Sequence, residues 1–108
     1  MSLDRLKEAI EQKAPISFEY NKQGKVEGVR VGNPHAVFIM RRKDGTESTK
    51  VHIYQTDGVS DSGQVLPSFR MFDLEEITNV KILELSAFEI AEQYNPEWDG
   101  YKFTIARV

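Results

Sequence analysis

The sequence lacks several residue types and patterns, and each absence excludes a class of protein. It has 108 residues and no cysteine, which excludes disulfides, thiolate metal sites and cysteine nucleophiles and fits a reducing compartment. No apolar run approaches the roughly 18 residues that a membrane-spanning helix needs. Residues 1–15 are amphipathic and charged, without the apolar core of a secretion signal. We therefore expect a cytoplasmic protein with no membrane partner.

Positive charge is also scarce. The formal net charge is −3 and the isoelectric point is near 5.4, which argues against bulk electrostatic binding of nucleic acid. The charge is uneven, however: residues 1–50 hold ten Lys and Arg against seven Asp and Glu, whereas residues 51–108 hold four against ten. A local basic face in the first half stays open as a hypothesis, around Arg30, Arg41, Arg42, Lys43 and Lys50. The simpler interpretation of the run 41–43 is a solvated hairpin tip.

Catalytic motifs are missing as well. The nucleophile elbow, the phosphate-binding glycine loop, the dinucleotide fingerprint and the zinc-protease helix are all absent. A triad of His35 with Asp57 or Asp61 and a loop serine is conceivable, but the chain spacing supports none of the geometry it requires. The loop 57–63 carries oxygen ligands without the alternation and terminal glutamate of a calcium loop. We expect no enzyme, no catalytic residue, no metal ligand and no cofactor.

The hydrophobic pattern predicts one helix followed by strands. Forty per cent hydrophobic content in so short a chain suits a single domain with one core, spanning 1–108. Leu3, Leu6, Ile10 and Ala14 recur at helical spacing. Pro15 ends this helix, and Ser2 is a candidate N-cap.

After residue 15 the apolar period changes to two, which indicates short strands. Strands are predicted at 16–21, 26–32, 33–42, 49–56, 68–74, 79–85 and 101–108, with a short turn or 3-10 helix at 75–77. Gly28 suggests a bulge or tight bend, and Asp44-Gly45 predicts a hairpin turn. Residues 86–94 could form either a helix or a strand. The fold class we predict is mainly β (α+β): a small antiparallel barrel over about 15–85, preceded by a helix and followed by an extension, 86–108, that ends in a strand.

One stretch, PSFRMFDLEEI at 67–77, raises a functional question. Alternation places Arg70 on the side of Phe72 and Leu74, which a barrel would bury, so Arg70 either contacts a ligand or reaches the rim and is solvated. His52 and Tyr54 share one face of their strand. If they converge with Arg70, they form a pocket for an anionic or nucleobase ligand, with arginine for phosphate and rings for stacking. The simpler alternative for His52 is a half-exposed strand face or a core histidine with one satisfied nitrogen.

The order of these motifs resembles the WYL domain. The run R-x-F-x-L-x-x-I ends at Ile77, and the segments LKEAIEQKAPISFEY (6–20), RVGNPHAV (30–37) and KVHIYQTDG (50–58) resemble other parts of that family, over roughly residues 3–85. The resemblance implies an Sm/SH3-like β-barrel module of bacterial origin. Such modules usually follow a helix-turn-helix DNA-binding domain in transcription regulators, where they are thought to sense nucleic-acid or nucleotide-like ligands.

The sequence also departs from the family pattern. Val51-His52-Ile53 stands at the place of the Trp-Tyr-Leu triplet, and the second arginine of the Arg-x-Phe-Arg pattern is Asp73. An acceptor-only anion there would make a phosphate site repulsive. The next basic position of the pattern is Glu76. We find no helix-turn-helix, so the resemblance is to a divergent, stand-alone module rather than to a complete regulator.

Two functional hypotheses follow from these observations. In the first, the resemblance implies a non-catalytic ligand-sensing or regulatory module that binds a nucleotide-like or single-stranded nucleic-acid ligand through Arg30, His52, Tyr54 and Arg70. In the second, the acidic second half favours a protein-interaction or homo-oligomerisation module without a small ligand. Its contact surface would be the barrel face or the aromatic residues of the extension, Phe88, Tyr94, Trp98 and Tyr101.

Overall fold

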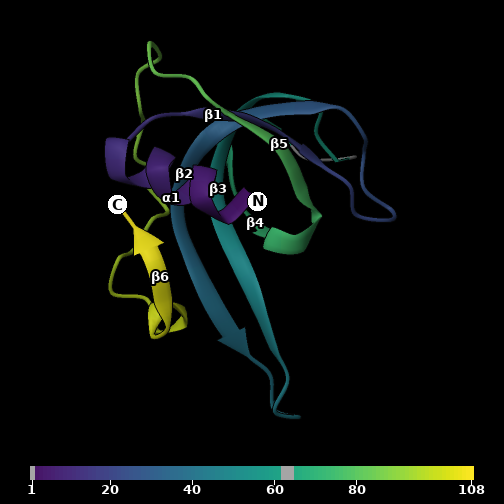
Figure 1. The fold of residues 1–108 in the computed structure, drawn as a ribbon, viewed down its shortest axis with the longest axis vertical. Coiled ribbons are helices and arrows are strands. Elements are labelled where there is room, and N and C mark those ends of the chain that lie inside the picture. Colours follow the sequence, from purple (N-terminus) through teal and green to yellow (C-terminus); the bar gives the residue numbers. More distant parts are fainter. Residues whose placement is uncertain (1, 62–64) are drawn as a thin grey trace.

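The structure is a computed structural model that describes residues 2–61 and 65–108. Its elements in chain order are α1 (Ser2–Gln12), β1 (Ile16–Tyr20), β2 (Val29–Arg41), β3 (Glu47–Gly58), β4 (Ser68–Asp73), the 3-10 helix η1 (Leu74–Glu76), β5 (Ile77–Ile82), the 3-10 helix η2 (Asp99–Tyr101) and β6 (Thr104–Arg107). Figure 1 shows α1 lying across one face of a curved sheet, with the long β2–β3 hairpin extending beyond it. The predicted mainly-β fold with an N-terminal helix is confirmed.

The strands form an open antiparallel sheet, so the prediction of a closed barrel is wrong. The order is β4-β3-β2-β1-β5, with β6 paired to β2. Only the three residues of η1 join β4 to β5, so the sheet curls until its ends approach, yet no ladder joins them. The hydroxyl of Tyr20 instead accepts the backbone N–H of Asp73 at 2.9 Å. Bulges in β1 and β2 supply the curvature.

The helix packs as its periodicity predicts. Leu6, Ala9 and Ile10 are buried, and they join a core made by the inward faces of the strands and η1. The helix ends at Gln12, close to the predicted stop. The hydroxyl of Ser2 donates to the carbonyl of Ile77 at 2.6 Å, so it ties the helix to β5 rather than serving as an N-cap. No helix in the described part of the chain is long and apolar enough to cross a membrane.

The two strands predicted at 26–32 and 33–42 are one strand, β2. Pro34 lacks a donor but is tolerated because the register shifts between Pro34 and Ala36. The bend predicted at Gly28 lies just before β2, with φ +133°. A Cβ there would lie 2.8 Å from the side chain of Val59, so this close approach requires glycine.

Residues 86–94 form neither of the two predicted elements. The segment is held by its side chains instead: Phe88 and Tyr94 pack against the ring of His35, and the backbone N–H of Ala91 donates to Nε2 of His35 at 3.0 Å. It thereby covers the sheet face opposite α1. The predicted terminal strand exists as β6, but it begins only at Thr104.

Candidate anion-binding groove

The pleat of the sheet divides the four predicted site residues into two pairs. Ile53 of β3 pairs with Arg70 of β4, so Arg70 shares the core face of the sheet. Arg30 lies on the same face, completely buried. His52 and Tyr54 alternate with Ile53 and therefore face the other side, beneath residues 86–101. The four residues do not converge on one pocket.

The two arginines meet at Asp61, in the loop that follows β3. Nη2 of Arg30 lies 3.2 Å from Oδ1 of Asp61, and Nη2 of Arg70 lies 2.5 Å from Oδ2. Both guanidiniums also donate to Oε1 of Gln55, at 3.3 and 3.1 Å. Gln55 in turn donates to the carbonyl of Val59 at 2.7 Å, which fixes the start of the loop. These charge-assisted bonds lock both arginines to the loop.

The carboxylate of Asp61 stays ionised in this cluster. Burial raises its pKa, but the backbone N–H of Val26 and the guanidiniums of Arg30 and Arg70 outweigh burial and hold the pKa below its ordinary value. Lys25 adds a further cation, with Nζ 3.8 Å from the carboxylate. The cluster therefore gathers three cations around one carboxylate.

Arg30 and Arg70 differ in how far their side chains are exposed at the surface. Arg30 is 0% exposed, with its guanidinium carbon 5.7 Å from the ring centres of both Tyr20 and Phe72, and its Nε has no partner among the described residues. The side chain of Arg70 is 10% exposed and lines a surface groove. Arg30 is thus a structural centre, and of the two arginines only Arg70 presents surface to the groove.

The groove beside Arg70 has a volume of about 300 Å³ and concentrates positive charge. It is lined by Tyr20, Lys22, Lys25, Lys50, Asp61, Phe69, Arg70, Met71, Phe72 and Asp73. Four of these side chains are cations and two are carboxylates, so the groove is net positive on a chain whose net charge is −3. A local field of this sign attracts anions even to an acidic protein.

The repulsion expected from Asp73 is offset by two lysines. Nζ of Lys22 lies 2.5 Å from its carboxylate, and Lys50 forms a second ion pair with it. Burial raises the pKa of Asp73, but the two lysines outweigh burial and lower it to about 2. Lys50 belongs to the basic set that the sequence predicts, whereas Lys22 and Lys25 lie between the strands predicted at 16–21 and 26–32 and belong to no predicted site. Only the positive charge of Lys22 and Lys25 could have indicated that they line the groove.

His52, on the opposite face, is enclosed by rings. Its Nδ1 lies 2.6 Å from the hydroxyl of Tyr101, and the rings of Phe38, Phe69 and Trp98 lie within 5.4 Å of its own. Burial, with a smaller contribution from the charge of His35, lowers the pKa of His52 to about 4. The imidazole is therefore neutral at neutral pH.

His35 is satisfied at both ring nitrogens. Nδ1 lies 2.7 Å from the carbonyl of Asn33, and Nε2 accepts the N–H of Ala91. Burial lowers its pKa as well. The ring of Tyr54 packs edge-on against it at 6.4 Å. These contacts leave the imidazole of His35 bonded to backbone groups rather than to the aspartates that a triad would need.

Thermal unfolding should show a pH dependence that comes from His52. Its folded pKa of about 4 lies below the ordinary value of 6.5, so the stability from its neutral ring is complete above pH 6.5 and is lost as the pH falls toward 4. Discounted for the partial exposure of the ring, the loss is about 1 kcal/mol, or roughly 5 °C in Tm between about pH 7 and about pH 4.5. His52→Gln should show a smaller fall, with a remainder from His35. An equal fall in both proteins would contradict this assignment.

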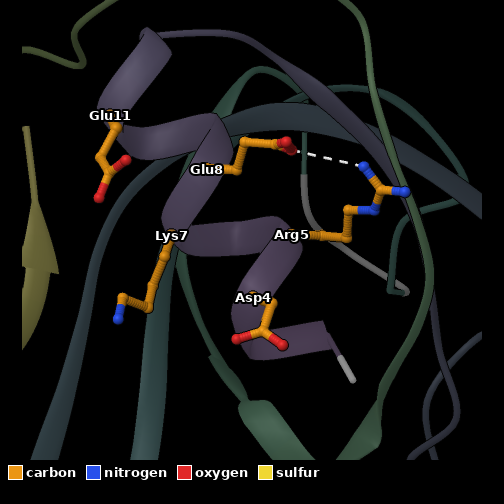
Figure 2. Close-up of a pocket in the computed structure, with 5 residues that line it drawn as sticks. All are labelled: Asp4, Arg5, Lys7, Glu8 and Glu11. Atoms are coloured by element: carbon orange, nitrogen blue, oxygen red, sulfur yellow. Dashed lines mark hydrogen bonds and ion pairs between the residues drawn. The ribbon is translucent and has the colours of Figure 1, made fainter.

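Other charged surfaces on the described chain are solvated. Arg41, in the β2–β3 hairpin, pairs with Glu47 at 2.5 Å and its side chain is 61% exposed, as a solvated hairpin tip predicts. Figure 2 shows the outer side of α1, where five charged side chains point away from the core and one ion pair joins Arg5 to Glu8 at 3.4 Å. Three carboxylates and two cations lie together there, so this surface carries little net charge to attract a ligand. Among the described residues, no group of three or more His, Cys, Asp or Glu could hold a metal ion.

Comparisons with known proteins support the fold. No family model matches the chain, and no curated protein matches it. A similar solved structure is the proteasome accessory factor B/C (PafBC) of Arthrobacter aurescens, with a TM-score of 0.63 and 21% identity. The match covers 88% of this chain and 13% of that one. At this identity the match shows only that the chain shares a fold with part of that protein, which is consistent with the WYL-like fold that the sequence resemblance predicts.

Proposed function

We propose that this chain is a non-catalytic, ligand-sensing module of the cytoplasm that binds a phosphate of a nucleotide-like or single-stranded nucleic-acid ligand in the groove beside Arg70. The observation that carries the proposal is the grouping of Arg70 with Lys22, Lys25 and Lys50 in one groove on an acidic protein. These four cations come from β4, β3 and the loop between β1 and β2.

The two carboxylates of the groove occupy its cations only in part. Lys22 and Lys50 each donate one hydrogen bond to Asp73. Because an ammonium group has three donors, both lysines keep donors for a phosphate. Asp61 holds Arg70 in the same way. A phosphate carries more acceptor oxygens than a carboxylate and can compete for these cations.

Support for a regulatory role comes from the fold. The chain resembles the WYL domain in sequence and part of a proteasome accessory factor in structure. Both are consistent with a module that responds to a ligand. The positive charge of the groove, rather than this likeness, is our reason for proposing an anionic ligand.

Binding of a fluorescently labelled single-stranded hexanucleotide at low salt tests the proposal. Arg70→Ala should weaken binding about tenfold or more, because it removes a charge-assisted contact to phosphate. The affinity of the unchanged protein should also fall steeply as salt is added. Arg42→Ala, which removes an exposed arginine outside the groove lining, is the control and should bind normally. The absence of binding, or binding indifferent to Arg70→Ala, would overturn the proposal.

A protein-interaction or homodimer module is the second candidate, and one observation favours it. Trp98, Phe103 and Ile105 lie near the C-terminus and are 41%, 39% and 37% exposed. Exposed apolar residues of this kind are common at interfaces. Light scattering over a range of protein concentrations decides: a dimer that Ile105→Lys dissociates would support this candidate, and a monomer at every concentration would count against it.

A further inference from the structure

A second cavity lies on the sheet face opposite the core, and it differs from the anion groove in chemistry. Its volume is about 470 Å³, and it is lined by Met40, His52, Phe69, Met71, Gln93, Asn95, Trp98 and Tyr101. No Lys, Arg, Asp or Glu is among these residues. Because an ion would lose hydration there without gaining an opposite charge, the cavity suits an uncharged group.

The walls of the cavity favour a flat aromatic ring. The ring of His52 lies 4.8 Å from that of Phe69 and 5.4 Å from that of Trp98. Trp98 is 41% exposed and Met71 46%, so both present apolar surface that a ligand can cover. Aromatic rings stack on such surfaces, and thioethers make favourable contacts with ring edges.

His52 also offers the cavity a hydrogen-bond donor. The hydroxyl of Tyr101, which is 8% exposed, has no acceptor among the described residues other than Nδ1 of His52. Tyr101 therefore donates to Nδ1, and this hydrogen-bond network places the ring proton of His52 on Nε2. Neither Nε2 nor the side-chain amide of Gln93 has a hydrogen-bond partner in the described part of the chain, so both are available to a ligand.

We propose that this cavity holds the base of the nucleotide-like ligand whose phosphate lies in the anion groove, an inference that rests on the function proposed above. Phe69 and Met71 line both cavities, because β4 is the edge strand that separates them. A ligand that crosses this edge can place its phosphate on one side and its base on the other. The ring is then recognised by stacking and by hydrogen bonds to Nε2 of His52 and to Gln93, so the ligand is a nucleotide rather than a simple anion.

The fluorescence of Trp98 reports occupancy of this cavity directly, because the chain has a single tryptophan. Adenosine, adenosine monophosphate and inorganic phosphate are the three probes. Adenosine and its monophosphate should both change the fluorescence in a saturable way, and phosphate alone should not. The monophosphate should bind about tenfold more tightly than adenosine, because it adds charge-assisted contacts in the groove.

Two variants and a control sharpen the test. His52→Phe keeps the ring and removes the donor, so adenosine should bind about fivefold more weakly. Gly100→Ala should also weaken it, because a Cβ there would lie 2.2 Å from the ring of Trp98 and displace it. Ile90→Ala changes a residue that is 50% exposed and lies outside the cavity lining, and should bind as the unchanged protein does.

The outcomes separate the two proposals. Oligonucleotide binding that depends on Arg70, without any response of Trp98 to adenosine or its monophosphate, would overturn the base cavity and leave the anion groove in place. A response to adenosine that the added phosphate does not strengthen would support the cavity and count against the groove. Adenosine binding that neither His52→Phe nor Gly100→Ala weakens would also overturn the base cavity.

Discussion

Arg30→Ala is expected to lower the free energy of unfolding by about 4 kcal/mol, while Arg70→Ala lowers it by about 1.5 kcal/mol. Arg30 is completely buried between the rings of Tyr20 and Phe72, so its removal leaves a cavity as well as unpaired acceptors. Arg70 lies at the groove, and Asp61 keeps its bond to Arg30 when Arg70 is truncated. The two variants therefore separate the structural role of Arg30 from the binding role that we propose for Arg70.

Urea unfolding, monitored by circular dichroism, measures the free energy of unfolding that each of the two variants loses. Arg42→Ala removes an exposed arginine whose side chain has no hydrogen bond or ion pair among the described residues, and it should change stability by less than about 0.5 kcal/mol, which controls for the loss of one positive charge. An Arg70→Ala protein as destabilised as Arg30→Ala would show that both arginines are structural. That result would remove the main reason to place a ligand beside Arg70.

Gly58→Ala is expected to destabilise the protein by at least about 3 kcal/mol. Gly58 pairs with Arg30 across the β2–β3 ladder and has φ +89°. A Cβ there would lie 2.2 Å from the carbonyl oxygen of Val29 and 2.7 Å from Cα of Arg30, and these backbone atoms cannot move aside cheaply. The substitution would also disturb the start of the loop that carries Asp61.

Gly45→Ala is the matched control for this experiment. Gly45 has nearly the same backbone angle, φ +90°, but nothing lies within 4 Å of its added Cβ. Its cost should therefore be only the conformational penalty, about 1 kcal/mol. Thermal and urea unfolding of the two variants isolate the effect of close packing. Equal costs would mean that Gly58 is not held against β2 as described.

Alternation along single strands predicted which side Arg70 faces, and the structure agrees. The same rule correctly placed His52 and Ile53 on opposite faces of the sheet, yet it could not tell whether His52 and Arg70 share a face. That relation depends on the register between β3 and β4, in which Ile53 rather than His52 lies opposite Arg70. Register is set by hairpin geometry and core packing across the sheet, which the alternation of one strand does not contain.

The lysines of the groove were harder to predict than the arginine. Lys22 and Lys25 lie in the loop between β1 and β2, and they reach Asp73 and Asp61 only because the sheet curls. Long-range ion pairs of this kind leave no periodic signal. The prediction of a closed barrel was wrong for a related reason. The backbone N–H of Asp73 donates to the hydroxyl of Tyr20 rather than to a neighbouring strand, and nothing in the strand pattern indicated this side-chain contact.

The central claim is that the cations of the groove are present for an anionic ligand and are partly occupied by the protein's own carboxylates. The hexanucleotide affinity of Asp73→Asn, measured at low salt, tests it most directly. The substitution removes one negative charge and leaves Lys22 and Lys50 with a neutral neighbour. We expect the Asp73→Asn protein to bind about fivefold more tightly than the unchanged protein, an effect opposite in direction to that of Arg70→Ala. Unchanged or weaker binding by a folded Asp73→Asn protein would contradict it.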